Sequence, residues 1–108
     1  MKHLVKKIIY RHALSTGDWY DLAMVPGSGT LSVQTSTDDN GQVSQYSLEA
    51  VIPRRQWTGD SSLDVGLTFI VSLEDGLQAR IGTRERPARI TLTDSDNIRA
   101  EVSWNDIP

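Results

Sequence analysis

The sequence contains no cysteine, so it forms neither a disulfide nor a thiolate metal site. This composition is compatible with a reducing compartment. No apolar run approaches the roughly 20 residues that a transmembrane helix needs. Lys6 and Lys7 interrupt the apolar residues near the start, and no small-residue cleavage site follows them. We therefore predict no signal peptide and expect a cytoplasmic protein.

Known catalytic motifs are also missing. The chain has no Gly-x-Ser-x-Gly elbow, phosphate-binding loop, dinucleotide fingerprint or His-Glu-x-x-His zinc motif. His3 and His12 stand beside no recognisable nucleophile, and we interpret them as surface or strand residues. Asp38-Asp39-Asn40 and Asp94-Ser95-Asp96-Asn97 resemble fragments of calcium loops, but hairpin turns need the same residue types. We predict no enzyme, no metal and no cofactor.

The charge and length exclude other classes. The formal net charge is −3, which argues against a general affinity for nucleic acid or for anionic membranes. With 108 residues, 38% hydrophobic and 23% charged, the chain has the material for one core. We expect one domain over residues 1–108.

Alternating hydrophobicity predicts strands joined in hairpins. From Leu63 to Leu73 every odd position is apolar, and Leu77, Ala79 and Ile81 share one face of the next segment. A three-residue loop, Glu74-Asp75-Gly76, opposes Leu73 to Leu77, Val71 to Ala79 and Phe69 to Ile81, whereas a two-residue turn opposes apolar to polar residues. We therefore predict this loop, with Gly76 in the left-handed region.

Two further hairpins follow from the same argument. Ser95-Asp96-Asn97 as a loop opposes Leu92 to Ala100 and Ile90 to Val102, and Asn97 is predicted to take the left-handed position. Around Asn40-Gly41, a two-residue turn opposes Val33 to Leu48, and a four-residue loop opposes Val33 to Tyr46. The side-chain pattern permits both registers.

The stretch from His3 to Leu14 suits either a helix or a strand, and its β-branched and aromatic residues favour the strand. Residues 15–29 and 53–62 are predicted as loops. Six or seven short strands in hairpins predict an all-β fold, either a small antiparallel sandwich or a partly open barrel.

Two groups of residues are candidates for partner binding. The first contains the arginines of residues 80–89: Arg80, Arg84, Arg86 and Arg89. Arginine makes bidentate contacts with carboxylates and phosphates, and Pro87 favours an edge or loop. The alternative is a solvated edge that charge protects from aggregation. The second group contains Trp19, Tyr20 and Trp57, which are either lids over the barrel or protein-contact anchors.

Three segments resemble small β proteins from phage and prophage structural regions. They are Gly17-Asp18-Trp19-Tyr20-Asp21-Leu22, Leu48-Glu49-Ala50-Val51-Ile52-Pro53-Arg54, and Leu73 to Thr83 with Pro87 and Arg89 after it. The resemblance implies a virion or tail-assembly component without an activity of its own, located in the bacterial host or in the virion.

The leading hypothesis is a structural or assembly module that contacts other protein subunits, including copies of itself or phage structural proteins. The alternative is a domain that binds a small ligand, a sugar or a peptide, with Trp19, Tyr20 and Trp57 on the binding surface. A deep apolar cavity favours the alternative, and a filled interior argues against it.

Overall fold

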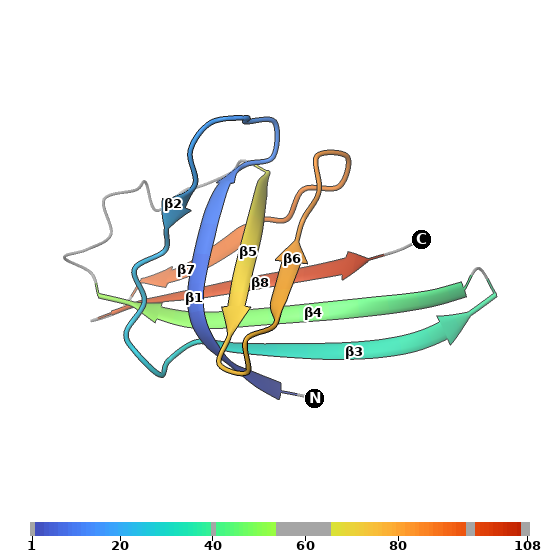
Figure 1. Ribbon diagram of the computed structural model, residues 1–108, viewed down its shortest axis with the longest axis horizontal. Coiled ribbons are helices and arrows are strands. Elements are labelled where there is room, and N and C mark those ends of the chain that lie inside the picture. The colour runs from blue at the N-terminus through green and yellow to red at the C-terminus, as the bar shows by residue number, and fades with distance from the viewer. Residues whose placement is uncertain (1, 40, 54–65, 95–96, 107–108) are drawn as a thin grey trace.

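The structure is a computed structural model that describes residues 2–39, 41–53, 66–94 and 97–106 (Figure 1). These residues form strands and no helix. The strands are β1 (Lys2–His12), β2 (Tyr20–Asp21), β3 (Thr30–Asp38), β4 (Gly41–Ile52), β5 (Leu67–Leu73), β6 (Gln78–Ile81), β7 (Ile90–Asp94) and β8 (Ile98–Asp106). The prediction of a strand near the start is confirmed. Trp57 and the predicted strand residues 63–65 lie outside the described residues.

All the pairings are antiparallel, and the strand order is β6-β5-β1-β3-β4-β8-β7, with β2 also paired to β1. The sheet curls into a half-barrel, which confirms the partly open barrel of the two predicted forms. Figure 1 shows β1, β5 and β6 running across β3, β4, β7 and β8. We call the first group, with β2, layer 1, and the second group layer 2.

Strand β1 joins the two layers. Residues Lys2 to Leu4 pair with β3 in layer 2, and the rest of the strand pairs with β5 in layer 1. The register shifts between Val5 and Lys7, so Lys6 is the additional residue of a bulge. A bulge bends a strand and increases its twist, which is how one strand turns a corner between crossing layers.

The β5–β6 hairpin has the predicted register. Phe69 pairs with Ile81 and Val71 with Ala79, and the amide of Leu73 donates to the carbonyl of Leu77 at 2.9 Å. Gly76 has a φ of 91°, as predicted. The side chain of Leu77 is 63% exposed, however, so it does not extend the apolar row into the core.

The β7–β8 hairpin also has the predicted register, because Leu92 pairs with Ala100 and Ile90 with Val102. The prediction of a left-handed Asn97 is wrong, since no described residue other than glycine has a positive φ. Asp94 pairs with Ile98, so the predicted register forms although Asn97 does not have this conformation. Left-handed backbone is unfavourable for any residue with a β-carbon.

The β3–β4 hairpin takes the register that opposes Val33 to Tyr46. Pairing continues to Asp38 and Gly41. Of the two registers that the side-chain pattern permits, the structure thus has the one of the four-residue loop, with Asp38 and Gly41 as one additional pair. The distal half of the hairpin projects beyond the rest of the molecule as an arm (Figure 1).

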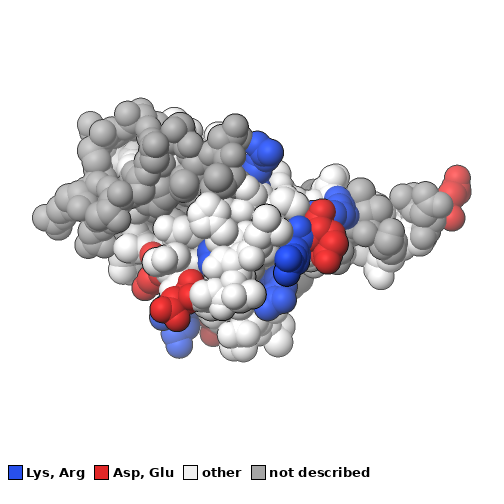
Figure 2. Space-filling model, turned by 90° about the horizontal axis from the view of Figure 1, so that it is seen from above, with Lys and Arg blue, Asp and Glu red and all other residues white. Residues whose placement is uncertain are grey.

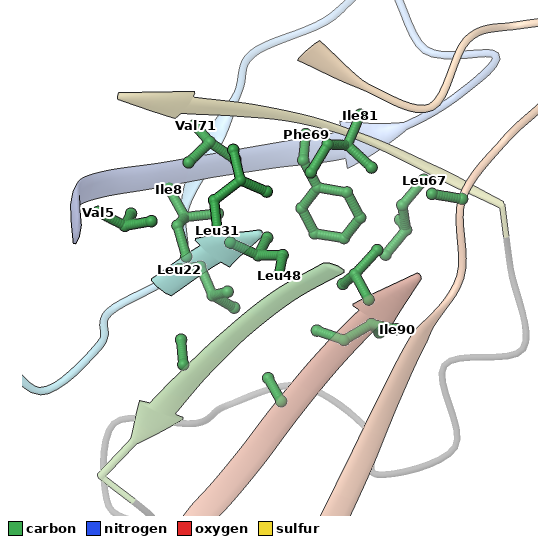
Figure 3. Close-up of a cluster of buried hydrophobic side chains, with 14 of the residues drawn as sticks. Val5, Ile8, Leu22, Leu31, Leu48, Leu67, Phe69, Val71, Ile81 and Ile90 are labelled. Carbon is green, nitrogen blue, oxygen red and sulfur yellow. The ribbon is translucent and has the colours of Figure 1, made fainter. Parts of the chain in front are cut away.

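The hydrophobic core lies between the layers (Figure 3). Phe69, Ile8, Val71 and Ile81 point from layer 1 toward Leu31 and Leu48 of layer 2, and all are at most 2% exposed. The facing of Phe69 and Ile81 confirms the predicted apolar row. Burying the large side chains of this cluster contributes about 1.5–3 kcal/mol each, which makes the core the main source of stability.

The segment after β6 returns to the edge of β5. Leu67 and Ala88 exchange two backbone hydrogen bonds, Leu67 N–H to Ala88 O at 2.7 Å and Ala88 N–H to Leu67 O at 2.9 Å. Residues 83–87 therefore loop out between β6 and this bridge. The chain then crosses to layer 2 as β7, so one continuous segment connects the two outermost strands.

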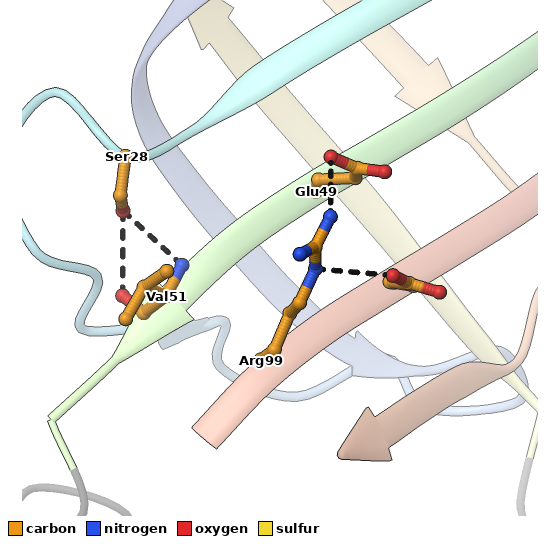
Figure 4. A network of polar contacts seen from close by, with 5 residues as sticks. Ser28, Glu49, Val51 and Arg99 are labelled. Carbon is orange, nitrogen blue, oxygen red and sulfur yellow. Dashed lines mark hydrogen bonds and ion pairs between the residues drawn. The ribbon is translucent and has the colours of Figure 1, made fainter. Parts of the chain in front are cut away.

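Polar contacts connect the ends of the long strands (Figure 4). The Ser28 hydroxyl donates to the carbonyl of Val25 at 2.7 Å and accepts from the amide of Val51 at 3.1 Å. On β8 the Arg99 guanidinium bridges Glu49 and Glu101 at 3.2 and 3.1 Å. These ion pairs are exposed and therefore contribute little, whereas Ser28 fixes the loop before β3 against β4.

Candidate functional site

The structure brings together Trp19, Arg80 and Arg84, three of the predicted partner-binding residues. They line a hollow of about 400 Å³ on the outer face of layer 1, which we call the arginine–tryptophan hollow. Its other lining residues are Arg11, Ala13, Ser15, Thr16, Thr68, Gly82, Thr83 and Glu85. The hollow therefore combines three guanidinium groups with one indole ring and several hydroxyls.

The floor of the hollow follows from strand alternation. Arg11 pairs with Thr68, and Arg80 pairs with Ile70, across three adjacent strands. Their sequence neighbours Phe69 and Ile81 face the core, so Arg11, Thr68 and Arg80 face outward. Thr68, in the middle strand of this floor, is nevertheless buried, at 9% exposure.

Two loops form the walls. In the first, the amide of Gly17 donates to Ser15 Oγ at 3.0 Å, and the amide of Ala13 donates to the carbonyl of Gly66. In the second, Thr83 N–H donates to Arg86 O at 2.9 Å, and Arg86 N–H donates to Thr83 Oγ1 at 3.0 Å. These local bonds define the shape of both loops. Figure 2 looks onto this end of the molecule and shows basic and acidic side chains next to each other on its surface.

Arg11 is held in place by Trp19. Its guanidinium carbon lies 4.3 Å from the centre of the Trp19 ring, and its Nη1 donates to the carbonyl of Gly17 at 2.9 Å. A cation over an indole face is favourable by about 0.5–1 kcal/mol at an exposed site. Arg11 is thus positioned within the protein, and Arg80 and Arg84 remain exposed at the hollow.

Arg80 and Arg84 have no ion-pair partner in the part of the chain that the structure describes. Glu85 also lines the hollow, so its charge is not uniform. An arginine with unused donors at a concave surface is suited to a planar anion such as a carboxylate.

Tyr20 lies outside this hollow. Its ring packs on Tyr10 at 5.9 Å between centroids and is 60% exposed, and Tyr10 in turn packs on Phe69 at 6.3 Å. Burial, with a smaller contribution from Tyr20, raises the pKa of Tyr10 above its ordinary value of 10.0. Tyr20 is therefore part of an aromatic row that leads into the core.

Arg86 belongs to a second cluster. Its guanidinium carbon lies 5.8 Å from the centre of the Trp104 ring, and Trp104 Nε1–H donates to the carbonyl of Arg86 at 3.0 Å. Trp104 stacks on Tyr46, its partner across the β4–β8 pairing, at 5.8 Å. Arg89 is exposed just before β7 and does not line the hollow. The four predicted arginines therefore do not form one cluster, because Arg80 and Arg84 line the hollow and Arg86 and Arg89 do not.

Sequence reasoning missed Arg11, Tyr46 and Trp104. Arg11 comes from the opposite end of the sequence to Arg80, and only the pairing of β1 with β5 brings the two near each other. Lys7 and Arg11 lie on the same face of the strand, and two basic residues there indicate that this face points to solvent. The sequence does not indicate which strand pairs with β1.

The histidines of β1 do not gather with acidic groups. His3 is half-buried, His12 is exposed, and within the described ranges no three His, Cys, Asp or Glu side chains come close enough to hold a metal ion. The same residues include no helix of a length and hydropathy that could span a membrane.

The fold defines a class, a half-barrel of antiparallel strands with an arginine–tryptophan hollow on its outer face. No protein-family model, curated protein or solved structure matches the chain.

Proposed function

We propose that the protein is a non-catalytic structural or assembly module that binds other protein subunits through the arginine–tryptophan hollow. The partner presents carboxylates to Arg80 and Arg84. The setting in a phage or prophage virion or tail is part of the proposal and rests on the sequence resemblance. The proposal that this hollow is the contact surface rests on one observation. Arg80 and Arg84 are exposed in the hollow that Trp19 also lines, and they have no acidic partner among the described residues.

The composition of the hollow supports a protein partner. Arginine and tryptophan are enriched among the residues that dominate protein interfaces. A carboxylate that enters the hollow can accept from two guanidinium groups, and the half-buried Trp19 offers apolar area beside them. Such charge-assisted bonds are about twice as strong as neutral ones.

A protein partner fits better than nucleic acid. The formal net charge of −3 opposes a phosphate backbone, and Glu85 stands in the lining of the hollow. A surface that binds single strands needs a basic groove with several stacking rings, and this hollow has one ring, Trp19, with Arg11 over one of its faces.

The test is a charge reversal, Arg80→Glu with Arg84→Glu. The binding of purified products of neighbouring genes is measured by calorimetry or biolayer interferometry, and light scattering gives the oligomeric state. The control is Lys6→Glu with Lys7→Glu, which changes the net charge equally on exposed residues outside the hollow.

We expect the arginine variant to weaken partner binding at least about tenfold and the lysine control to leave it within about twofold. Binding in the wild type is also expected to weaken as salt increases. The proposal fails if the wild type is monomeric at high concentration and binds none of these products, or if the arginine variant binds as well as the wild type.

One observation favours the alternative, a small-ligand binding domain. A hollow of about 410 Å³ on the outer face of layer 2 is lined by uncharged polar side chains that suit the hydroxyls of a sugar. They include Ser32, Gln34, Gln45, Ser47, Ser103 and Asn105. The space between the layers is filled by the core, so this candidate rests on the surface hollow (Figure 3). Chemical-shift changes confined to these residues on titration with simple sugars would support it, and their absence would remove it.

A further inference from the structure

The outer edge of β3 in the arm has no neighbouring strand. Among the described residues, the β1–β3 pairing covers Thr30 to Ser32, while β3 continues along β4 to Asp38. From Gln34 to Thr37, β4 lies on one side, and no strand of the described part of the chain lies on the other. We call this stretch the open edge. Figure 1 shows it as the outermost strand of the projecting arm.

The open edge lacks the features that usually prevent edge pairing. Its residues Gln34, Thr35, Ser36 and Thr37 carry no charge, and they include no proline. The β3–β4 register runs without a bulge from Thr30 to Asp38. A regular, uncharged edge of this kind is a template for another strand. By contrast, the outer strand β6 has four residues, one of which is Arg80.

A partner strand would also support the arm. Among the described residues, the last pair of β8 with β4 is Asp106 with Ser44, so the tip of the arm beyond it is described as two strands. A hairpin of two strands is only marginally stable in water, and a third strand stabilises it.

We propose that the open edge pairs antiparallel with the open edge of a second copy of this chain, forming a two-fold symmetric dimer. An edge that pairs with itself must tolerate its own residues opposite, and Gln, Thr and Ser do so without like-charge repulsion. A two-fold axis perpendicular to the sheet keeps each face on its own side. Thr35 and Thr37 of one copy therefore meet Thr35 and Thr37 of the other.

Charge complementarity favours the second copy as the occupant. The exposed Asp39 lies at the tip of the arm, and the exposed Lys2 pairs with Ser32 just before the open edge begins. Antiparallel pairing of two edges brings the tip of each arm to the Lys2 end of the other. Each acidic tip thus meets a basic end, twice in one dimer.

The dimer uses a surface distinct from the arginine–tryptophan hollow. None of the residues that line the hollow belongs to β3 or β4. The contact is short, so we expect a weak, concentration-dependent association. The two surfaces can therefore be tested separately.

The first experiment compares two double variants by sedimentation velocity over a range of concentrations. Thr35→Lys with Thr37→Lys places four lysines together at the proposed interface. Gln42→Lys with Ser44→Lys is the matched control, because Gln42 pairs with Thr37 and Ser44 with Thr35 on the inner strand of the same hairpin. Circular dichroism and thermal unfolding establish that both variants fold.

We expect the wild type to approach twice the monomer mass as the concentration rises. The open-edge variant should associate at least about tenfold more weakly, and the control within about twofold of the wild type. A wild type that stays monomeric at the highest concentration overturns the proposal. Equal association of both variants does so as well.

A charge swap provides a second test that leaves the open edge unchanged. Lys2→Glu alone should weaken the dimer, and Lys2→Glu combined with Asp39→Lys should restore it. If Lys2→Glu alone weakens association and the combined variant does not restore it, the proposed contact between Asp39 of one copy and Lys2 of the other is contradicted. Arg80→Glu with Arg84→Glu should leave the dimer unchanged, so loss of the proposed partner binding and loss of the dimer are distinguishable.

Discussion

At the scale of single residues, glycine is required where the backbone turns left-handed against a neighbour. Gly82 has a φ of 86°, and a β-carbon there would lie 2.5 Å from the carbonyl oxygen of Leu67 and 3.0 Å from the amide nitrogen of Ala88. Those two atoms belong to the bridge that joins β5 to the segment before β7. Gly76 has a φ of 91°, but a β-carbon there would meet nothing within 4 Å.

Gly82→Ala is therefore expected to cost more than Gly76→Ala. Gly76→Ala is the control, and its cost is only that of placing alanine in the left-handed region, about 1–2 kcal/mol of unfolding free energy. Gly82→Ala adds a backbone clash that separates Leu67 from Ala88, and we expect about 3 kcal/mol or more of lost unfolding free energy. Urea denaturation of both variants measures this difference. Equal losses would show that the close approach at Gly82 is unimportant.

Tyr10 gives the stability a dependence on alkaline pH. Burial penalises its phenolate, so the pKa in the folded protein lies above the ordinary 10.0. The folded state then holds this proton more tightly than the unfolded state does. The stability from neutral Tyr10 is complete below pH 10 and is lost as the pH rises through the folded pKa.

Tyr10→Phe should therefore reduce the decline of unfolding free energy above pH 10. Urea denaturation at several pH values from 8 to 11 measures the slope, and Tyr46→Phe is the control that removes a different half-buried phenol. An unchanged slope in Tyr10→Phe would mean that other groups cause the alkaline loss.

At the scale of elements, Ser28 connects the loop before β3 to the end of β4. Ser28→Ala removes the acceptor of the Val51 amide and the donor to the Val25 carbonyl. We expect a loss of about 1–2 kcal/mol, because the partly buried Val51 amide loses its acceptor, while the Val25 carbonyl keeps its bond from the amide of residue 28. Ser103→Ala, on the exposed face of β8, should change the stability by less than about 0.5 kcal/mol. Similar values for the two variants would contradict the structural role of Ser28.

Hairpins are the elements that the sequence predicts best. The two strands are neighbours in the chain, and the number of loop residues between them, odd or even, decides which side chains share a face. The opposition of Phe69 to Ile81 and of Ile90 to Val102 followed from the apolar rows and the odd loop lengths. Asn97 shows the limit of this reasoning. The alternation of side chains indicates whether the loop has an odd or an even number of residues, but not which loop residue takes a given conformation. The extra pair at the tip of the β3–β4 hairpin was likewise open.

The partners of β1 could not be predicted in the same way. Its neighbours β5 and β3 are distant in the sequence, and the bulge at Lys6 that lets it serve both has no local signature. Alternation identified which residues of the second half face outward, but only the fold places Arg11 in the same hollow as Arg80. The sequence therefore predicted three of these four residues of the candidate site, Trp19, Arg80 and Arg84, and missed Arg11.

At the scale of the whole molecule, the half-barrel depends on the segment that leads from β6 to β7. The bridge to Leu67 ties this segment to layer 1, and Trp104 ties it to layer 2 through the carbonyl of Arg86. The indole thus connects the last strand of the chain to the loop that also walls the arginine–tryptophan hollow.

Trp104→Phe tests this connection, because phenylalanine keeps a ring beside Tyr46 and removes the Nε1–H donor. We expect a loss of about 1 kcal/mol from the missing hydrogen bond. Hydrogen exchange should also be faster at the amide of Ala88, which the loop holds against Leu67. Tyr46→Phe, which keeps the stacked pair and the indole donor, is the control and should leave exchange at Ala88 unchanged. If Ala88 exchanges at the wild-type rate in Trp104→Phe, the loop is held by layer 1 alone, and the indole does not couple the two layers.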